Sequence, residues 1–216
     1  MGLPKKFDDR LKNNLGLRAV WLPGTQIDLG AVLQLKDGIF ESIANLSDFG
    51  VNFRWRELGG DLSLKFQARG VSSMVFQAGA QVDLSHVDIK ANTELKIDFK
   101  EEDTYFIRAP KLSGIGISNL MTVAKAVARL SEWQHRRYFI AWNVYRAGEF
   151  VFLGSQSKNK SVRFQGSGSD IIDFLTVGAS ANVAKVTASS VNIEIMGKGG
   201  PLALRVTRIK KNGRPF

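Results

Sequence analysis

Alternation of apolar and polar residues with a period of two dominates residues 51–100. Such alternation is typical of strands, because successive side chains of a strand point to opposite faces. It is most regular from Val87 to Lys100, and Met74 to Leu84 keeps the same parity before a turn expected at Ser85-His86. We therefore predict two long neighbouring strands, the second extending over roughly 48 Å, which is much longer than an ordinary strand.

Helical spacing replaces this alternation in three places. Phe7, Leu11 and Leu15 recur every four residues, which predicts a short amphipathic helix over 4–15 that ends at Gly16. A second helix is expected to begin after Ser118 or Asn119, with an apolar stripe formed by Leu120, Val123, Val127 and Leu130 and a polar stripe formed by Lys125, Arg129, Glu132 and Arg136. A third, short helix is expected over 169–175.

The rest of the chain has the composition of strands. An Asp37-Gly38 turn predicts a hairpin between 29–35 and 39–43. Further strands are expected at 17–22, 137–145, 150–154, 161–164, 177–186, 190–195 and 202–209, the last two separated by a turn at Gly197 to Pro201. We predict an α+β fold with a twisted, mostly antiparallel β-sheet and flanking helices, built as a single domain over 1–216.

Composition narrows the functional classes. The 216 residues include 30 Lys+Arg and 20 Asp+Glu, a net charge of +10, and no cysteine. The lack of cysteine excludes disulfides, thiolate nucleophiles and S-acylation. The sequence has no run of about twenty apolar residues, so it predicts no membrane-spanning helix, although membrane-spanning strands stay possible. The first thirty residues lack the features of a secretory signal, so we expect the chain to start inside a cell.

Catalytic chemistry has little support in the sequence. His86 and His135 are the two histidines, and we interpret them as a turn residue and a structural residue. The glycines near 166 and 197 match neither a phosphate-binding loop nor a dinucleotide-binding fingerprint. The spacing of adjacent acidic pairs such as Glu101-Glu102 does not by itself bring two carboxylates to one catalytic site. We predict no catalytic residues, no metal site, no cofactor and no enzymatic activity.

The excess of basic over acidic residues suggests an anionic partner. Five cations and no acid occupy the last twelve residues, and further cations lie near the other terminus. Such clusters suit nucleic acid or anionic lipid surfaces, and they also suit an ordinary soluble basic surface. Aromatic residues could stack on single-stranded nucleic acid. Three of the tryptophans, however, fall on predicted apolar faces, where core packing is the more common role: Trp55, Trp133 and Trp142.

The segments from about Leu17 to Ile209 follow a recognisable order. The first helix leads into Leu17-Arg-Ala-Val-Trp-Leu-Pro23, and the Asp-Gly hairpin is followed by Leu46-Ser-Asp-Phe49. A long alternating pair of strands precedes the main helix, and Pro201-Leu-Ala-Leu-Arg-Val-Thr-Arg-Ile209 closes the set of strands. This order resembles that of the bacterial gasdermins. The resemblance implies a gasdermin N-domain-like fold without enzymatic activity.

The resemblance also implies that the active form is a homo-oligomer, in which two long hairpin regions refold into a large membrane β-barrel. Open sheet edges cannot persist in lipid, so such strands must join in a closed ring. The second inserting region would come from Arg137 to Phe164. The lipid-facing residues of the first would be Val87, Ile89, Ala91, Leu95, Ile97 and Phe99, although the same alternation also fits a half-buried strand of a soluble sheet.

Partners and location follow from the same resemblance. Anionic membrane lipid would contact the cations of the first helix, which are Lys5, Lys6, Arg10 and Lys12. The protein would be cytoplasmic when inactive and at the inner membrane when active, in a bacterial cell-death or anti-phage response. A protease activator or a separate inhibitory partner is expected to control it.

Two features depart from the bacterial gasdermin pattern. The chain has no cysteine for acylation near its start, and only residues 210–216 follow the last predicted strand. We expect this tail to be too short and too basic to cover an apolar site. The chain would then be an active fragment, be silenced by another protein, or have the fold without the pore. The alternative function is a soluble basic interaction module that binds nucleic acid or a protein partner.

Overall fold

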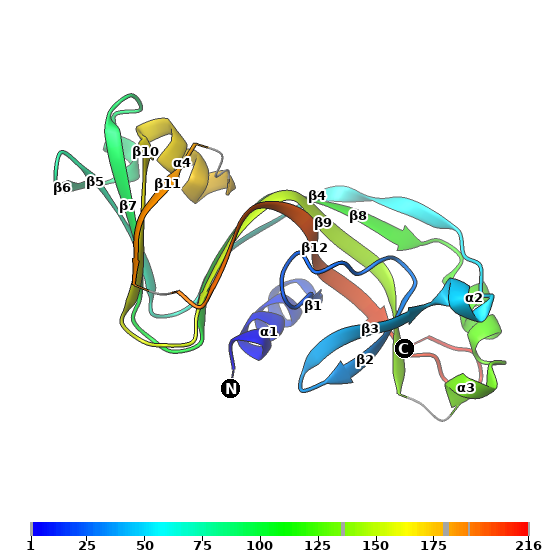
Figure 1. Ribbon diagram of the computed structural model, residues 1–216. Helices are drawn as coiled ribbons and strands as arrows, with labels where there is room; N and C mark the ends of the chain where they lie inside the picture. The colour runs from blue at the N-terminus through cyan, green and yellow to red at the C-terminus, as the bar shows by residue number, and fades with distance from the viewer. Residues whose placement is uncertain (1, 135–136, 179–181, 190, 216) are drawn as a thin grey trace. The chain divides into compact units, whose positions relative to one another are not determined.

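The computed structural model describes residues 2–134, 137–178, 182–189 and 191–215 (Figure 1). The chain forms two compact units. Unit 1 comprises 1–6, 62–112 and 147–199, and unit 2 comprises 7–61, 113–146 and 200–216. The boundaries fall inside five elements, namely α1 (Leu3–Leu15), β4 (Trp55–Gln67), β8 (Thr104–Ile117), β9 (Tyr138–Ser155) and β12 (Ile193–Thr207). The single-domain organisation over 1–216 stays a prediction.

The fold class is α+β, as the sequence predicts. The described residues form a seven-stranded sheet in which β1 (Arg18–Ala19), β12, β9, β2 (Ala31–Lys36) and β3 (Ile39–Asn45) follow one another, with β8 beside β9 and β4 beside β8. A five-stranded sheet has the order β11 (Ala184–Ser189), β10 (Lys160–Ser167), β7 (Asn92–Phe99), β5 (Val71–Gln77) and β6 (Ala80–Val82). Strand pairs such as β2–β3, β5–β7 and β7–β10 are antiparallel.

Unit 2 contains the predicted hairpin and the larger part of the first helix, from Phe7 onward. Asp37 and Gly38 both have positive φ, 51° and 83°, which a tight turn between β2 and β3 requires. Helix α1 ends at Leu15, and Gly16 follows with a φ of 65°. The carboxylate of Asp8 accepts hydrogen bonds from the Arg18 guanidinium and the Ala19 N–H, the latter at 2.8 Å, and so holds α1 against β1.

The predicted main helix is divided into two shorter ones. Helix α2 spans Leu120–Val127 and α3 spans Ser131–Gln134. Between them the N–H groups of Arg129 and Leu130 bond to carbonyls three residues back, which tightens the backbone and ends α2. The apolar stripe still packs against the core of unit 2, together with Trp133. His135 and Arg136 lie outside the described residues.

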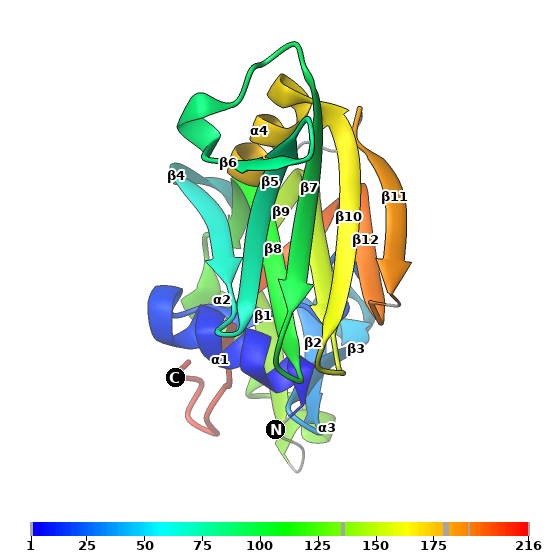
Figure 2. The same ribbon diagram turned by 90° about the vertical axis from the view of Figure 1, so that its left-hand side faces the viewer.

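Unit 1 corrects the prediction of two long alternating strands. The segment from Met74 to Leu84 turns back at Ala78 and Gly79, which have φ values of 50° and 81°, and this turn separates β5 from β6. Ser85-His86 lies in a 3₁₀ turn, η2 (Leu84–His86), and β7 begins only at Asn92. The expected pairing is nevertheless present, because β5 and β7 are antiparallel neighbours (Figure 2).

One predicted gap between strands and one predicted turn are absent, because the strands continue through them. β9 is an 18-residue strand that joins the segments predicted at 137–145 and 150–154. β12 is a 15-residue strand that runs through Gly197 to Pro201. A Cβ atom on Gly199 would lie 2.5 Å from the carbonyl oxygen of Gly148, so this glycine permits a close approach of two backbones rather than a turn.

Smaller differences concern short segments. Of the strand predicted at 17–22, Arg18 and Ala19 are in β1. The segment predicted as a strand over 177–186 begins at the end of α4 (Gly168–Val177) and reaches β11 only at Ala184, while 179–181 and 190 lie outside the described residues. The third predicted helix is present as α4. Among the helices of the described residues, none has the length and apolarity needed to cross a membrane.

Candidate functional site

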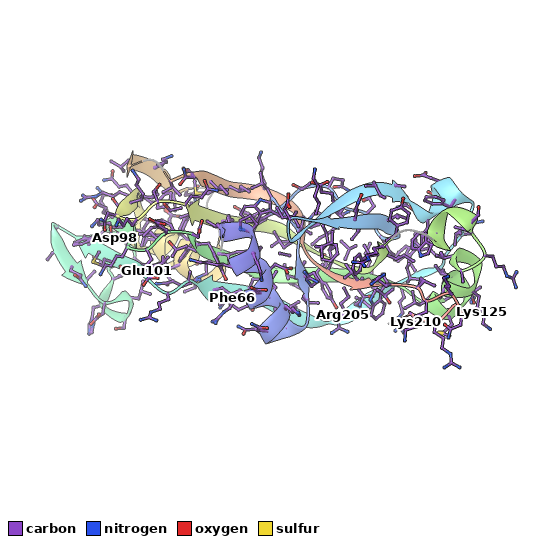
Figure 3. The ribbon with its side chains drawn as sticks, turned by 90° about the horizontal axis from the view of Figure 1, so that it is seen from below. Phe66, Asp98, Glu101, Lys125, Arg205 and Lys210 are labelled. Atoms are coloured by element: carbon purple, nitrogen blue, oxygen red, sulfur yellow. The ribbon has the colours of Figure 1, made fainter. Side chains whose placement is uncertain are left out.

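Four short connections in unit 1 join strands of the seven-stranded sheet to strands of the five-stranded sheet. β4 leads into β5, β7 into β8, β9 into β10, and β11 into β12, with three or four residues between the strands. Three of these connections contain residue types that readily adopt positive φ, namely Gly70 (80°), Asp103 (52°) and Asn159 (58°). Figure 3 marks Asp98 near the end of β7 and Glu101 in the connection that follows.

The two layers have the same strand order. In one the strands follow as β4, β8, β9 and β12, and in the other their chain neighbours follow as β5, β7, β10 and β11. The connections are themselves hydrogen-bonded to one another. The Lys100 N–H donates to the Gly70 carbonyl at 2.8 Å, and the Gln156 N–H donates to the Asn192 side chain at 2.8 Å. Each strand therefore has the same neighbours on both sides of its turn.

One apolar core joins the five-stranded sheet, α4 and the long strands. Phe174 of α4 lies near the centre of this core, 4.7 Å from the ring centroid of Phe164 on β10 and 6.4 Å from that of Phe106 on β8. The buried strand residues of the core are Val71, Val75, Leu95, Ile97, Phe99, Phe106, Val151, Leu153, Val162 and Phe164. Burial of these side chains stabilises the layered arrangement.

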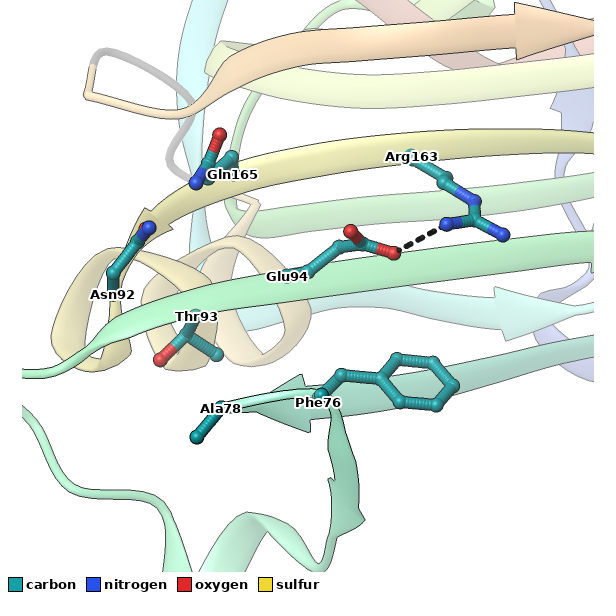
Figure 4. A pocket seen from close by; sticks show the side chains of 8 residues that line it. Phe76, Ala78, Asn92, Thr93, Glu94, Arg163 and Gln165 are labelled. Carbon is teal, nitrogen blue, oxygen red and sulfur yellow. Dashed lines mark hydrogen bonds and ion pairs between the residues drawn. The ribbon is translucent and has the colours of Figure 1, made fainter.

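The opposite face of the five-stranded sheet is polar. Arg163 on β10 pairs with Glu94 on β7 at 3.0 Å (Figure 4). Lys96 pairs with Asp98 at 2.9 Å. Beside the first pair is an open cavity of about 420 Å³, which Phe76, Asn92 and Gln165 also line. The charged residues among the described lining are Arg163 and Glu94, and because they pair with each other, their charges balance within the cavity.

The N-terminus of α4 is fastened to the connection between β6 and β7. The N–H groups of Gly168 and Ser169 both donate at 3.0 Å, to the carbonyls of Ala91 and Ile89 respectively. A Cβ atom on Gly168 would lie 2.1 Å from the carbonyl oxygen of Asp88, so only glycine permits this contact. The Gln77 side chain holds the same connection by bonding both the N–H and the carbonyl of Asp88.

The C-terminus of α4 is fastened by Arg108 of β8. Its Nε donates to the Leu175 carbonyl at 2.7 Å, and its Nη1 donates to the Phe66 carbonyl of β4 at 3.2 Å. The guanidinium lies 4.3 Å from the ring centroid of Phe106, and burial lowers the pKa of Arg108 from its usual range. One half-buried cation therefore links α4 to two of the long strands.

The predicted membrane-inserting residues do not share one strand. Leu95, Ile97 and Phe99 are completely buried on the apolar face of β7, together with Thr93. Val87 is buried in the same core but precedes the strand, whereas Ile89 is 56% exposed. Ala91 lies in the turn before β7, half-buried. The continuous parity predicted from Val87 to Phe99 is thus correct only from Thr93 onward, because the connection to α4 bends the preceding residues. Their role in a membrane stays a prediction.

The predicted lipid-binding cations all lie on α1. Lys5, Arg10 and Lys12 are exposed, and the Nζ of half-buried Lys6 donates to the Glu102 carbonyl at 2.9 Å. At about 100° per residue, Lys5 and Lys12 share one side of the helix and Lys6 and Arg10 another. The four cations therefore form two rows along α1, and their contact with lipid stays a prediction.

Other predicted chemistry can also be placed. Among the described residues, no three His, Cys, Asp or Glu side chains come together as a metal site. His86 lies in η2, with Nδ1 at 3.3 Å from Ser85 Oγ. Trp133 is buried as expected, but Trp55 is 61% exposed at the start of β4, which contradicts its assignment to the core.

Sequence reasoning missed the docking of α4. Arg108 is the one charged residue of an otherwise apolar stretch of β8, Tyr105 to Ala109, and this isolation could have identified it. The matching strand order could not have been found, since it depends on which strands pair across long stretches of chain.

The apolar face of β7 leads to a prediction about stability. Leu95→Ala should lower the free energy of unfolding by about 2–5 kcal/mol, because it leaves a cavity in the core. Ile89→Ala should change it by less than about 0.5 kcal/mol, because Ile89 is exposed. Urea denaturation of both variants checks this. Equal effects would mean that the two residues share one buried face after all.

The cap of α4 leads to a prediction about pH. The Ser167 and Asn182 side chains donate to the Asp170 carboxylate and lower its pKa below the usual value of 3.8. Because the pKa is lower in the folded state, the contribution of this carboxylate is complete above about pH 5 and is lost as the pH falls through the lowered pKa. The stability difference between wild type and Asp170→Asn, measured by urea denaturation, should therefore shrink in acid. A difference that stays constant from about pH 7 to pH 2 would contradict this.

No protein-family model matches the chain, and no curated protein matches it. Among solved structures, a bacterial gasdermin from Bradyrhizobium tropiciagri is similar, with 13% sequence identity and a TM-score of 0.38. The similarity covers 97% of this chain and 89% of that chain. Because the identity and the TM-score are this low, what the chain does must follow from the geometry of its own residues.

Proposed function

We propose that the protein is a pore-forming protein of gasdermin type, which oligomerises on anionic lipid and forms a large β-barrel. The observation that carries this proposal is the matching strand order of the two layers in unit 1. If the four connections straighten, the layers merge into one four-stranded ribbon without any strand changing its neighbours. Its strands would comprise 55–77, 92–117, 138–167 and 184–207. Each is more than twice the length of about 10 residues that a membrane-spanning strand needs.

Straightening would also create an amphipathic ribbon. In the part of the ribbon that comes from the five-stranded sheet, the core residues Val71, Val75, Leu95, Ile97, Phe99, Val162 and Phe164 would stay on one face. Phe106, Val151 and Leu153 of the long strands are an odd number of residues away from them along the chain, so they would join this face only where a connection keeps one extra residue as a β-bulge. The paired charges of Glu94, Lys96, Asp98 and Arg163 would lie on the other face. One apolar face toward lipid and one polar face toward water is the arrangement that membrane barrels use.

Opening into the ribbon would require both lipid and oligomerisation, because of its cost in free energy. Exposing the ten large strand side chains of this core to water would cost roughly 1.5–3 kcal/mol each. The total, on the order of 20 kcal/mol, exceeds the usual stability of a domain, so the ribbon opens only where lipid receives its apolar face. A ribbon in lipid still has two unpaired edges, which further copies of the chain must cover.

Lipid contact and control complete the proposal. The exposed cations of α1, which include Lys5 and Lys12, would hold the protein at an anionic membrane before it opens. Helix α4 would keep the closed form shut, since Gly168 and Arg108 fasten its two ends. A protease or a separate inhibitory protein would set the timing, in a bacterial cell-death or anti-phage response at the inner membrane.

Proline at the connections tests the straightening. Within the described residues, the backbone N–H groups of Glu102 and Lys158 donate no hydrogen bond, so proline removes none from the closed form. In a straightened ribbon the same positions become strand interior, where proline removes a ladder bond. The wild type should release dye from vesicles containing anionic lipid, and Glu102→Pro with Lys158→Pro should release at least about tenfold less.

The matched control is Glu102→Ala with Lys158→Ala, which removes the same side chains and keeps both N–H groups. It should leak like the wild type, and circular dichroism should show that all three proteins are folded. Sealed vesicles with the wild type would contradict pore formation. Equal leakage of the folded proline variant would contradict straightening. Salt-sensitive binding to an oligonucleotide without vesicle binding would favour the soluble module.

The docking of α4 gives a second test. Arg108→Gln removes the guanidinium that bonds the Leu175 and Phe66 carbonyls and should loosen α4. Amide hydrogen exchange of 168–177 should become at least about tenfold faster, and dye release should begin sooner. The control is Arg163→Gln on the polar face, which should change neither. Unchanged exchange in Arg108→Gln would show that this arginine does not hold the helix.

A further inference from the structure

Charged residues are concentrated in the four connections of unit 1. Among the described residues of these connections they are Arg69, Lys100, Glu101, Glu102, Asp103 and Lys158. All but the half-buried Asp103 are exposed, and the side chain of Arg69 is 95% exposed. The connections therefore place a band of charge between the strands of the five-stranded sheet and the long strands that continue them.

Strand register lines up one residue from each connection. Phe99 at the end of β7 is the partner of Val71 on β5 and of Lys160 on β10. Continued into the connections, these registers and that of β10 with β11 would set four residues in one row across the straightened ribbon. They are Arg69, Glu101, Lys158 and Asn192. Part of the row is present in the closed form, because the Nε of Arg69 lies 4.0 Å from the Oε1 of Glu101.

This row would end an apolar face. Glu101 is two residues from Phe99, so the two side chains share one face of an extended strand. On that face of the described strands β5, β7 and β10, Lys160 beside the row is the one charged residue between the row and the far ends of the strands. The edge strand β11 is an exception, because Lys185 lies opposite Phe164. The face therefore changes from largely apolar to charged at the connections.

The first turn of α1 lies beside two of the connections. The Nζ of Lys6 donates to the Glu102 carbonyl, between β7 and β8, at 2.9 Å. Leu3 is completely buried, and a Cβ atom on Gly154 would lie 3.1 Å from its Cδ1. Gly154 comes directly before the last residue of β9, which leads into the connection to β10. The helix that carries the predicted lipid-binding cations therefore begins beside the charged connections.

We propose that the four residues of this row form a headgroup belt, at which insertion into the membrane stops. This inference rests on the pore function proposed above. The strands of the five-stranded sheet would cross the acyl chains, and the long strands would stay in water. A charge at the centre of a bilayer is costly, whereas a charge at its surface contacts water and lipid phosphates. β7 and β10 have eight residues each, which approaches the length of about 9–11 residues that a spanning strand needs.

Three single cysteines along β4 and β5 test the position of the headgroup belt, because the chain has no cysteine of its own. Ser63→Cys, Arg69→Cys and Ser73→Cys have the same parity and lie before, in and after the connection. Each variant carries a small fluorescent dye and is bound to vesicles of phosphatidylcholine and phosphatidylglycerol that contain a nitroxide-labelled lipid. A nitroxide in the middle of the acyl chain should quench the dye on Ser73→Cys at least about twofold more than on the other two. A nitroxide on the headgroup should quench the dye on Arg69→Cys most.

Gln34→Cys on β2 is the control, because Gln34 is exposed and lies outside the ribbon strands. Neither nitroxide should quench its dye. Circular dichroism checks that each labelled protein is folded before it meets the vesicles. Gln77→Cys provides a second position after the connection, on the same parity, if labelled Ser73→Cys does not fold.

Dye release from vesicles without nitroxide, measured for the same variants, reports pore formation separately from depth. Acyl-chain quenching of Arg69→Cys or Ser63→Cys as strong as that of Ser73→Cys would overturn the headgroup belt, and so would the absence of acyl-chain quenching at every position. Leakage together with either result means that the pore forms and the belt is misplaced. The expected depths without leakage support the belt and contradict the pore.

Discussion

The apolar core shared by the five-stranded sheet, α4 and the long strands is the contact on which the arrangement of unit 1 depends. Four short connections bring the two layers together, but the burial of side chains such as Leu95 and Phe164 keeps them there. The connections join the ends of consecutive strands, and the strand order matches across them. The backbone of three or four residues per strand therefore separates the two layers from a single ribbon.

This core also explains why the closed form would be stable in water and the proposed open form only in lipid. In water its large apolar side chains pack against one another, whereas in the proposed open form those of the five-stranded sheet would face lipid. The polar face changes little between the two, because its charges pair within one strand or between neighbouring strands. The barrier to the proposed opening would therefore lie in the core and in the fastening of α4 by Arg108 and Gly168.

Local patterns in the sequence determined the elements that depend only on neighbouring residues. The α+β class, the hairpin at Asp37-Gly38, α1, α4 and the alternation from Thr93 to Phe99 follow from turn chemistry and periodicity, because neighbouring residues decide them. Tertiary contacts decided the rest. β9 and β12 run through their glycines because each backbone lies against the other, and Ile89 leaves the apolar face because α4 holds its carbonyl. Pairing between distant strands cannot be derived from local spacing, so the matching order of the two layers required the fold itself.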